Sequence, residues 1–241
     1  MGEILAEMRR PDVEKRFNEG AVAILPIGAT EQHGPHLPYG TDTFAAVELA
    51  KRLNERLNNG ILLPPVPFGY SWVWRNIPGC IVLKEDTVKA LIKDIAVSLS
   101  RNGCRKFVII NGHEANNRPI KFAIRELSDE KVDIKILYFF YPDMRKFIEN
   151  DMESALWNGM LHACEFETSV MLAVKEELVD MNKAVKEYPA TPYDYGFSDD
   201  YLGDLSKSGV FGDPTRAAKE KGEKIIAASI RKIESILKND G

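Results

Sequence analysis

Cysteine is scarce in this chain and follows no pattern that would suit crosslinking. There are three cysteines, they are far apart, and no two of them form a Cys-x-x-Cys pair. An odd and scattered set excludes a disulfide framework of the kind found in small secreted domains. We therefore expect reduced thiols in an intracellular, cytoplasmic protein. The three residues are Cys80, Cys104 and Cys164.

Long apolar runs and long basic runs are also missing. No apolar stretch approaches the roughly 18 residues that a membrane-spanning helix needs. The segment Met1–Arg10 has no apolar signal core, so we expect neither export nor a membrane partner. The formal net charge is −4, and no basic tract is long enough to follow a nucleic-acid backbone. These absences leave a small molecule as the expected partner.

Short apolar runs alternate with amphipathic segments along most of the chain. Branched apolar residues fill Ala21–Ile27, Lys106–Ile110 and Ile134–Phe140, which we predict as buried strands. Two prolines restrict Ile61–Val66 to a short or edge strand. Such alternation is typical of an α/β fold, with a mostly parallel sheet and helices on both faces, here one domain over residues 1–241. Helices are expected over Asp42–Leu57, Asp86–Ser100, Pro119–Leu127, Glu165–Val174 and Pro214–Leu237, the last capped by Asp213.

The longest stretch without periodicity is Tyr188–Gly212, which is rich in proline, glycine, tyrosine and aspartate. Loops of this length usually cover a site, bind a partner or remain disordered. The pattern is equally compatible with a loop that covers the site and with one that contacts a neighbouring subunit.

The histidines lie beside carboxylates at the ends of predicted strands. There are four histidines, and His33 and His36 lie between Glu31 and Asp42, directly after the first predicted strand. His113 directly follows another strand. Because loops after neighbouring parallel strands meet at the same edge of the sheet, we expect these side chains to lie close together.

The residue types at this edge suit a metal site. Two carboxylates and two imidazoles form an oxygen and nitrogen ligand set suited to Zn²⁺, Mn²⁺ or Fe²⁺. A carboxylate can bridge two ions about 3.5–4 Å apart, which together activate a water. One histidine near a strand end would more often be structural, but two segments with the same chemistry favour the metal site. Glycines that permit tight loops occur in both segments, at Gly28, Gly34, Gly40 and Gly112.

Four segments resemble the signatures of the creatininase, or creatinine amidohydrolase, family. They follow the family's order and extend from about Ala21 to Gly222, and the first is long and specific. The resemblance implies a three-layer α/β/α sandwich, and a hydrolase with two divalent ions per chain, zinc first and manganese or iron as alternatives. It also implies a homo-oligomer, which is a hexamer in creatininase itself. The segments are Pro26–Asp42 (P-I-G-A-T-E-Q-H-G-P-H-L-P-Y-G-T-D), Ile109–Asn117 (I-I-N-G-H-E-A-N-N), Leu161–Ser169 (L-H-A-C-E-F-E-T-S) and Ser208–Gly222 (S-G-V-F-G-D-P-T-R-A-A-K-E-K-G).

The resemblance also implies roles for single residues. Glu31 and His113 would bind one ion and His33 the other, with Asp42 bridging the two. His162 matches a histidine that acts in proton transfer.

At one of the ligand positions the chain departs from creatininase, and several nearby acidic residues are candidates to replace the missing ligand. Creatininase has an acidic ligand two residues after its Asn-Gly-His histidine, where this chain has Ala115. Glu167 is the replacement we expect, since Glu114 is one residue out of place. Glu165 is expected to assist His162 in proton transfer.

Several other residues near the motifs allow more than one interpretation. Cys164 replaces an expected glycine, and we interpret it as a small buried thiol rather than a nucleophile. His36 is a candidate for orienting a ligand. Aromatic rings either wall a small-molecule pocket or belong to the core or a subunit contact. These rings are Tyr70, Trp72, Trp74 and Trp157.

The function expected from these observations is metal-dependent hydrolysis of a non-peptide C–N bond, in a cyclic amide or a formamide-like small molecule. Ala115 argues against creatinine as the substrate. One alternative is ring opening of a keto-inositol of the 3-dehydro-scyllo-inosose type. Another is a metal-containing binding protein without turnover, although such a protein would not need a proton donor such as His162 beside the ions.

Overall fold

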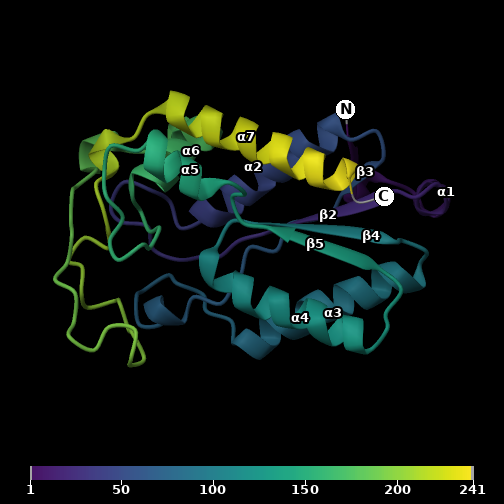
Figure 1. The fold of residues 1–241 in the computed structure, drawn as a ribbon, viewed down its shortest axis with the longest axis horizontal. Coiled ribbons are helices and arrows are strands. Elements are labelled where there is room, and N and C mark those ends of the chain that lie inside the picture. Colours follow the sequence, from purple (N-terminus) through teal and green to yellow (C-terminus); the bar gives the residue numbers. More distant parts are fainter. Residues whose placement is uncertain (1, 240–241) are drawn as a thin grey trace.

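A sheet of five parallel strands forms the centre of the computed structural model, which describes residues 2–239 (Figure 1). The strand order is β1-β3-β2-β4-β5, so β2 and β4 are neighbours although a strand lies between them in sequence. Every residue of β2 is buried, as expected for a parallel strand covered on both sides. The strands are β1 (Glu3–Ile4), β2 (Val22–Ile27), β3 (Gly60–Leu62), β4 (Lys106–Asn111) and β5 (Lys135–Phe139).

Helices cover both faces of the sheet (Figure 1). One layer contains α2 (Thr41–Arg56), α5 (Met144–Asn150), α6 (Glu165–Lys175) and α7 (Lys219–Lys238), and the other contains α3 (Glu85–Arg101) and α4 (Asn117–Asp129). A further helix, α1 (Arg10–Asn18), precedes β2. Short 3-10 helices span Leu5–Glu7, Trp72–Trp74, Glu114–Asn116, Glu176–Leu178, Met181–Lys183 and Pro214–Arg216. None of the helices among residues 2–239 is long and apolar enough to cross a membrane.

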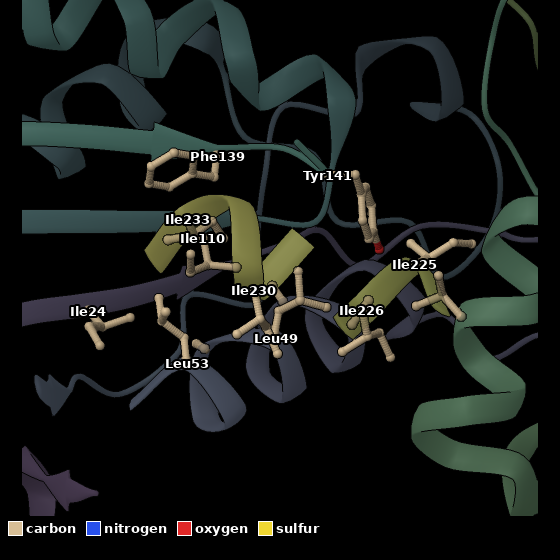
Figure 2. Close-up of a cluster of buried hydrophobic side chains, with 14 of the residues drawn as sticks. Ile24, Leu49, Leu53, Ile110, Phe139, Tyr141, Ile225, Ile226, Ile230 and Ile233 are labelled. Carbon is tan, nitrogen blue, oxygen red and sulfur yellow. The ribbon is translucent and has the colours of Figure 1, made fainter. Parts of the chain in front are cut away.

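Each face of the sheet has its own apolar core, because successive residues of a strand point to opposite faces. On the side of α2 and α7, Ile24 and Ile110 pack with Leu49, Leu53 and Ile230 (Figure 2). On the side of α3 and α4, the neighbouring residues of the same strands pack with the apolar positions of those helices. Burying one such side chain contributes about 1.5–3 kcal/mol, so the two cores fix the strand ends that carry the site.

The predicted α/β class is confirmed, and the predicted strands agree with β2, β4 and β5 to within one or two residues. The helix predicted over Pro214–Leu237 is wrong at its start. Asp213 accepts a hydrogen bond from Thr215 N–H, but it caps only a 3-10 turn, after which the chain is extended through Ala218. Ala218 N–H donates to the hydroxyl of Ser169 on α6, which favours the extended path, and α7 begins at Lys219. Helices α1 and α5 were not predicted.

The predicted long loop, Tyr188–Gly212, contains neither helix nor strand. It forms the yellow-green segment at one end of the molecule in Figure 1. Its two ends are tied together, because Glu187 and Gly212 exchange backbone hydrogen bonds of 3.0 and 2.8 Å. The Glu187 carboxylate also accepts hydrogen bonds from Ser206, Lys207 and Ser208. At its exposed tip, Tyr193 and Phe197 are fully open to solvent.

The Glu187 contacts predict a pH dependence for this loop. Burial alone would raise the pKa of Glu187, but hydrogen bonds from Ser208, Lys207 and Ser206 lower that pKa to about 2. Because the folded pKa lies below the ordinary value, the stabilisation is complete above about pH 4.5 and is lost as the pH falls through about 2. We expect intrinsic-rate-corrected hydrogen-exchange protection of the Lys207 and Ser208 amides to fall about tenfold or more over this range. In Glu187→Gln the protection should be low throughout; an unchanged wild-type profile in that variant would contradict the assignment.

Candidate metal and active site

The candidate site lies where β2 and β4 end. Ile27 pairs with Asn111, so the loops that follow these two strands leave the sheet side by side. The first turn of α2 approaches both loops closely. A Cβ atom on Gly28 would lie 2.4 Å from Thr43 N, and one on Gly112 would lie 2.1 Å from the Asp42 carbonyl oxygen. Glycine at these two positions therefore permits the approach that brings Asp42 to the strand ends.

All five predicted ligands meet in one buried cluster. Glu31, Asp42 and His113 form one group whose potential ligand atoms lie within 4.8 Å of one another. His33, Asp42 and Glu167 form a second such group. Asp42 is common to both groups, the position in which a bridging carboxylate is expected.

The distances show how Asp42 joins the two groups. Its Oδ1 lies 3.2 Å from His33 Nε2, and its Oδ2 lies 3.1 Å from His113 Nδ1. His33 Nε2 is 3.8 Å from Glu167 Oε2, and His113 Nδ1 is 3.5 Å from Glu31 Oε1. The two imidazoles therefore approach opposite oxygens of one carboxylate.

Several atoms in the cluster have no hydrogen-bond partner among the described residues. They are Glu31 Oε2, His33 Nε2 and Asp42 Oδ2, and all three are buried. Buried polar atoms without partners are uncommon and call for a ligand. Because these atoms are carboxylate oxygens and an imidazole nitrogen directed toward one another, a divalent cation fits the cluster.

The backbone orients both histidine rings for this purpose. His33 Nδ1 lies 3.3 Å from the Glu31 carbonyl oxygen, and His113 Nε2 lies 2.9 Å from the Tyr70 carbonyl oxygen. A carbonyl oxygen only accepts hydrogen bonds, so each of these nitrogens carries a proton. When a metal ion is bound, the other ring nitrogen of each histidine would present its lone pair to the cluster, as metal-binding histidines do.

Two asparagines hold the loop that carries His113, and the sequence analysis did not single them out. The Asn111 side chain exchanges hydrogen bonds with the backbone of His113, of 2.7 and 3.1 Å. Asn116 donates to the Gly28 carbonyl and accepts from Tyr70 N–H, which joins both strand-end loops to a third segment. The asparagine-rich pattern of Ile109–Asn117 was the available signal, because Asn can bond backbone donors and acceptors at once.

Electrostatics inside the cluster favour a bound cation. Burial lowers the pKa of His33 and of His113, but the neighbouring carboxylates more than compensate and raise these values to about 10 and about 9. Burial raises the pKa of Glu167 to about 7. Protons therefore supply positive charge among the carboxylates in the metal-free chain, and a cation would replace those protons on binding.

His162 lies beside the cluster and, unlike His33 and His113, is a neutral imidazole with a single ring proton. Burial, followed by the charge of His33, holds the pKa of His162 well below its usual range. Its ring stacks on Trp74, with the ring centres 4.3 Å apart, and its Nδ1 lies 3.6 Å from Glu31 Oε1. His162 also forms a third potential ligand group with Glu31 and His33.

A cavity of about 280 Å³ opens onto the cluster, close to the lower end of the size range of small-molecule sites. Glu31, His113, His162 and Glu167 contribute to its wall, together with Trp74 and residues of the long loop. A larger depression of about 670 Å³ lies between α1 and the end of α3 and contains none of these residues. The smaller cavity is therefore the candidate substrate site, because its wall contains predicted ligands. The loop residues in its wall are Tyr195, Asp200 and Leu202.

Glu165 is not brought to the cluster. Its carboxylate accepts hydrogen bonds from the backbone N–H groups of Glu153 and Ser154, and forms an ion pair of 2.5 Å with Lys221. Residues two apart on a helix point in nearly opposite directions, so Glu165 and Glu167 cannot both face the site. Glu167 faces it, and its Oε2 accepts a 2.6 Å hydrogen bond from Ala163 N–H.

The remaining candidates are distributed around the site. Ala115 and Glu114 line the cavity, but neither belongs to a potential ligand group among the described residues. Cys164 is buried, which raises its pKa to about 12, so it is a thiol at neutral pH. His36 Nε2 lies 2.9 Å from the hydroxyl of Thr168, next to Glu167. Of the aromatic residues, Trp74 lines the cavity, Tyr70 orients His113 through its carbonyl, Trp72 stacks with Arg75, and Trp157 packs against Tyr195 and Phe211.

Nearly the whole chain matches known proteins. The family model for creatinine amidohydrolase matches residues 6–237. The chain is 30% identical to the creatinine amidohydrolase of Pseudomonas putida, over 98% of this chain and 96% of that protein. It is 29% identical to the mycofactocin precursor peptide peptidase of Mycolicibacterium smegmatis, over 87% and 81% of the two chains. A crystal structure of creatinine amidohydrolase matches with a TM-score of 0.84 at 30% identity, covering 99% of this chain and 98% of that one.

Two further structures carry metals in their names. A mutant creatininase of the Zn-Zn type matches with a TM-score of 0.81 at 28% identity, covering 99% of this chain and 98% of that one. A structure named creatininase Mn matches with a TM-score of 0.82 at 28% identity and covers 99% of both chains.

Proposed function

The chain belongs to the creatinine amidohydrolase, or creatininase, family of hydrolases, and we propose that it uses two divalent metal ions to cleave a non-peptide C–N bond in a small cyclic amide or formamide. The observation that carries the proposal is the buried Asp42 carboxylate shared by two potential ligand groups. Each group adds one histidine and one glutamate to the shared oxygens. Zinc is the expected metal, with manganese or iron as alternatives.

In this proposal five side chains hold the ions and leave the cavity side open. Glu31 and His113 complete one site with Asp42, and His33 and Glu167 complete the other. Bound there, the ions would lower the pKa of a water toward about 7 and polarise the substrate oxygen. The Trp74 ring and residues of the long loop form part of the cavity wall, where they would replace water around a bound substrate. His162 would contact the atoms whose charge changes in the reaction, whereas the Glu165 carboxylate is held by Lys221 and by the Glu153 and Ser154 backbone.

The substrate class is supported by the cavity and by one of the relatives, although another relative acts on a peptide. A volume of about 280 Å³ is suited to a ring or short amide rather than to an extended peptide. The similarity to a creatinine amidohydrolase supports a cyclic amide. A keto-inositol is the alternative, because the same activated water could attack a ring ketone. A binding protein without turnover is disfavoured by the neutral His162 placed at the cavity wall.

The test combines metal analysis with a substrate panel of creatinine, a second lactam, an N-formyl amine, a keto-inositol and a short peptide. We expect turnover of a lactam or formamide that is lost after chelation and restored by zinc or manganese. Turnover of the keto-inositol alone would support the alternative. Full turnover by the chelated protein would contradict the metal mechanism, and bound metal with no turnover on any probe would support the binding protein.

A further inference from the structure

Gln32 lies between His162 and the long loop and makes three polar contacts. Its Oε1 accepts a 2.9 Å hydrogen bond from Gly34 N–H. Its Nε2 lies 3.1 Å from the Gly209 carbonyl oxygen and 2.7 Å from His162 Nε2. The Gln32 side chain is buried, so these protein groups, and not solvent, satisfy its hydrogen-bonding atoms.

Two of the contacts fix the orientation of the Gln32 amide. Gly34 N–H only donates and the Gly209 carbonyl only accepts. Turning the amide over would place an NH₂ group against the first and an oxygen against the second. The Gln32 group beside His162 is therefore the NH₂, which donates, and His162 Nε2 is the acceptor.

We infer that Gln32 is a positioning residue that holds His162 as the neutral tautomer with its proton on Nδ1. That nitrogen lies 3.6 Å from Glu31 Oε1, on the side of the cluster. His162 thus presents an N–H to the site, whereas His33 and His113 would present lone pairs to a bound ion. A protonated Nδ1 cannot bind a metal, so the third potential ligand group is not a metal site in this arrangement.

The same contact limits what His162 does in the reaction, a step that rests on the proposed function. A second proton on Nε2 would set two donors against each other at 2.7 Å, so Gln32 disfavours the charged imidazolium. A neutral ring with its proton on Nδ1 cannot accept a proton at that atom. His162 therefore donates a fixed hydrogen bond to the substrate oxygen as that oxygen gains negative charge. The proton that the attacking water loses reaches the leaving nitrogen through a carboxylate of the cavity wall, Glu31 or Glu167, and not through His162.

The contact also links His162 to the position of the loop. Gly209 has φ of +82°, and a Cβ on it would lie 2.0 Å from Gln32 Oε1, so the loop approaches as closely as it does because this residue is glycine. Phe211 N–H donates a 3.2 Å hydrogen bond to the His162 carbonyl. The loop backbone thus holds both the side chain that fixes the tautomer and the histidine itself.

Nitrogen-15 NMR of histidine-labelled, zinc-loaded protein tests the tautomer directly, because protonated and unprotonated ring nitrogens give separate signals. The chain has four histidines, so His162 is assigned by the signals that disappear in His162→Gln. We expect a proton on Nδ1 and none on Nε2 in the wild type. A proton on Nε2 would overturn the inference, whether or not any substrate is turned over, so this result is independent of the proposed function.

Variants separate the effect on the tautomer from an effect on the loop. In Gln32→Met we expect mixed tautomers, unchanged zinc content, and a kcat about 3- to 10-fold lower with little change in KM, the size of one neutral hydrogen bond. Trp157→Phe is the control, because it removes a hydrogen bond to the loop at Pro189 without touching Gln32. It should keep the wild-type tautomer. A single Nδ1 tautomer in Gln32→Met would overturn the role of Gln32.

Conservative replacement of His162 tests the hydrogen-bond role, on whichever member of the substrate panel is turned over. Asparagine keeps an N–H near the position of Nδ1 but cannot carry protons as imidazole does. We expect kcat of His162→Asn to stay within about tenfold of wild type, and that of His162→Ala to fall about 100- to 1000-fold. Equal losses in both variants would overturn the hydrogen-bond role and favour proton transfer.

Discussion

Replacing Asp42 with alanine is expected to remove both metal ions and with them all measurable hydrolysis. Asp42 contributes an oxygen to each potential ligand group, at 3.2 Å from His33 and 3.1 Å from His113. Without it each group keeps one histidine and one glutamate, too few to hold a divalent ion in a defined geometry. Loss of an outer hydrogen-bond partner costs about 10- to 100-fold in metal affinity, and loss of a shared ligand should cost more than about 100-fold.

The measurement is elemental analysis of protein purified without added metal. We expect close to two ions per chain in the wild type and none in Asp42→Ala. Asp86→Ala is a matched control, because Asp86 also lies in the first turn of a helix, but it is exposed and forms an ion pair with Lys89. One ion in the wild type would mean that only one of the two groups is a site. Full occupancy in Asp42→Ala would contradict the shared-ligand assignment.

Gly112→Ala is expected to damage the same site without changing any ligand. A Cβ on this residue would lie 2.1 Å from the Asp42 carbonyl oxygen, which is backbone and cannot turn aside. Either the end of β4 or the first turn of α2 must move, and Asp42 moves relative to His113. Overpacking of this kind typically costs about 1–3 kcal/mol in folding free energy. Metal affinity should fall by about 10- to 100-fold, as it does when a ligand loses its support.

Gly60→Ala separates the local effect from general destabilisation. Gly60 pairs with Val22, at the opposite end of the sheet from the site. A Cβ there would lie 2.3 Å from the Asn54 side-chain oxygen, a clash of similar closeness. Thermal unfolding and zinc titration of both variants provide the comparison. We expect a lower Tm in both variants, with the smaller decrease in Gly60→Ala because a side chain can move aside more easily than backbone. Zinc binding should be weaker only in Gly112→Ala, and equal zinc binding in the two would refute the local explanation.

The sheet, and the edge of the sheet that carries the site, could be predicted because both depend on residues that are close together in the sequence. The buried strands are short runs of branched apolar residues, and the strands in turn place Glu31, His33 and His113 at one edge. The structure brings Asp42 to that edge as well, through the close approach of glycine backbone to α2. Residue type and strand position were therefore sufficient to find four members of the cluster.

What was not predicted depends on contacts between distant segments. Glu167 was expected in the cluster from the family resemblance, but the expected place of Glu165 beside His162 was not found. The direction of α6 separates Glu165, which is bound by Lys221, from Glu167 in the cluster. Gln32 is an ordinary polar residue in the sequence, and its contacts are with residues far along the chain. Helices α1 and α5 are short, and α1 combines charged residues with a single buried side chain, so neither has strong periodicity.

The distance along the chain between interacting residues determines when the site is completed during synthesis. Gln32 and His162 are 130 residues apart in sequence, and Glu167 lies still further along on α6. A chain emerging from the ribosome exposes Glu31, Asp42 and His113 first, so one ligand group precedes the other. The second group exists only after α6 packs against α2, a late and non-local contact. For the proposed two-metal site, the ligands of the first group would therefore be synthesised before those of the second, and the pair would be complete only when the C-terminal half has folded.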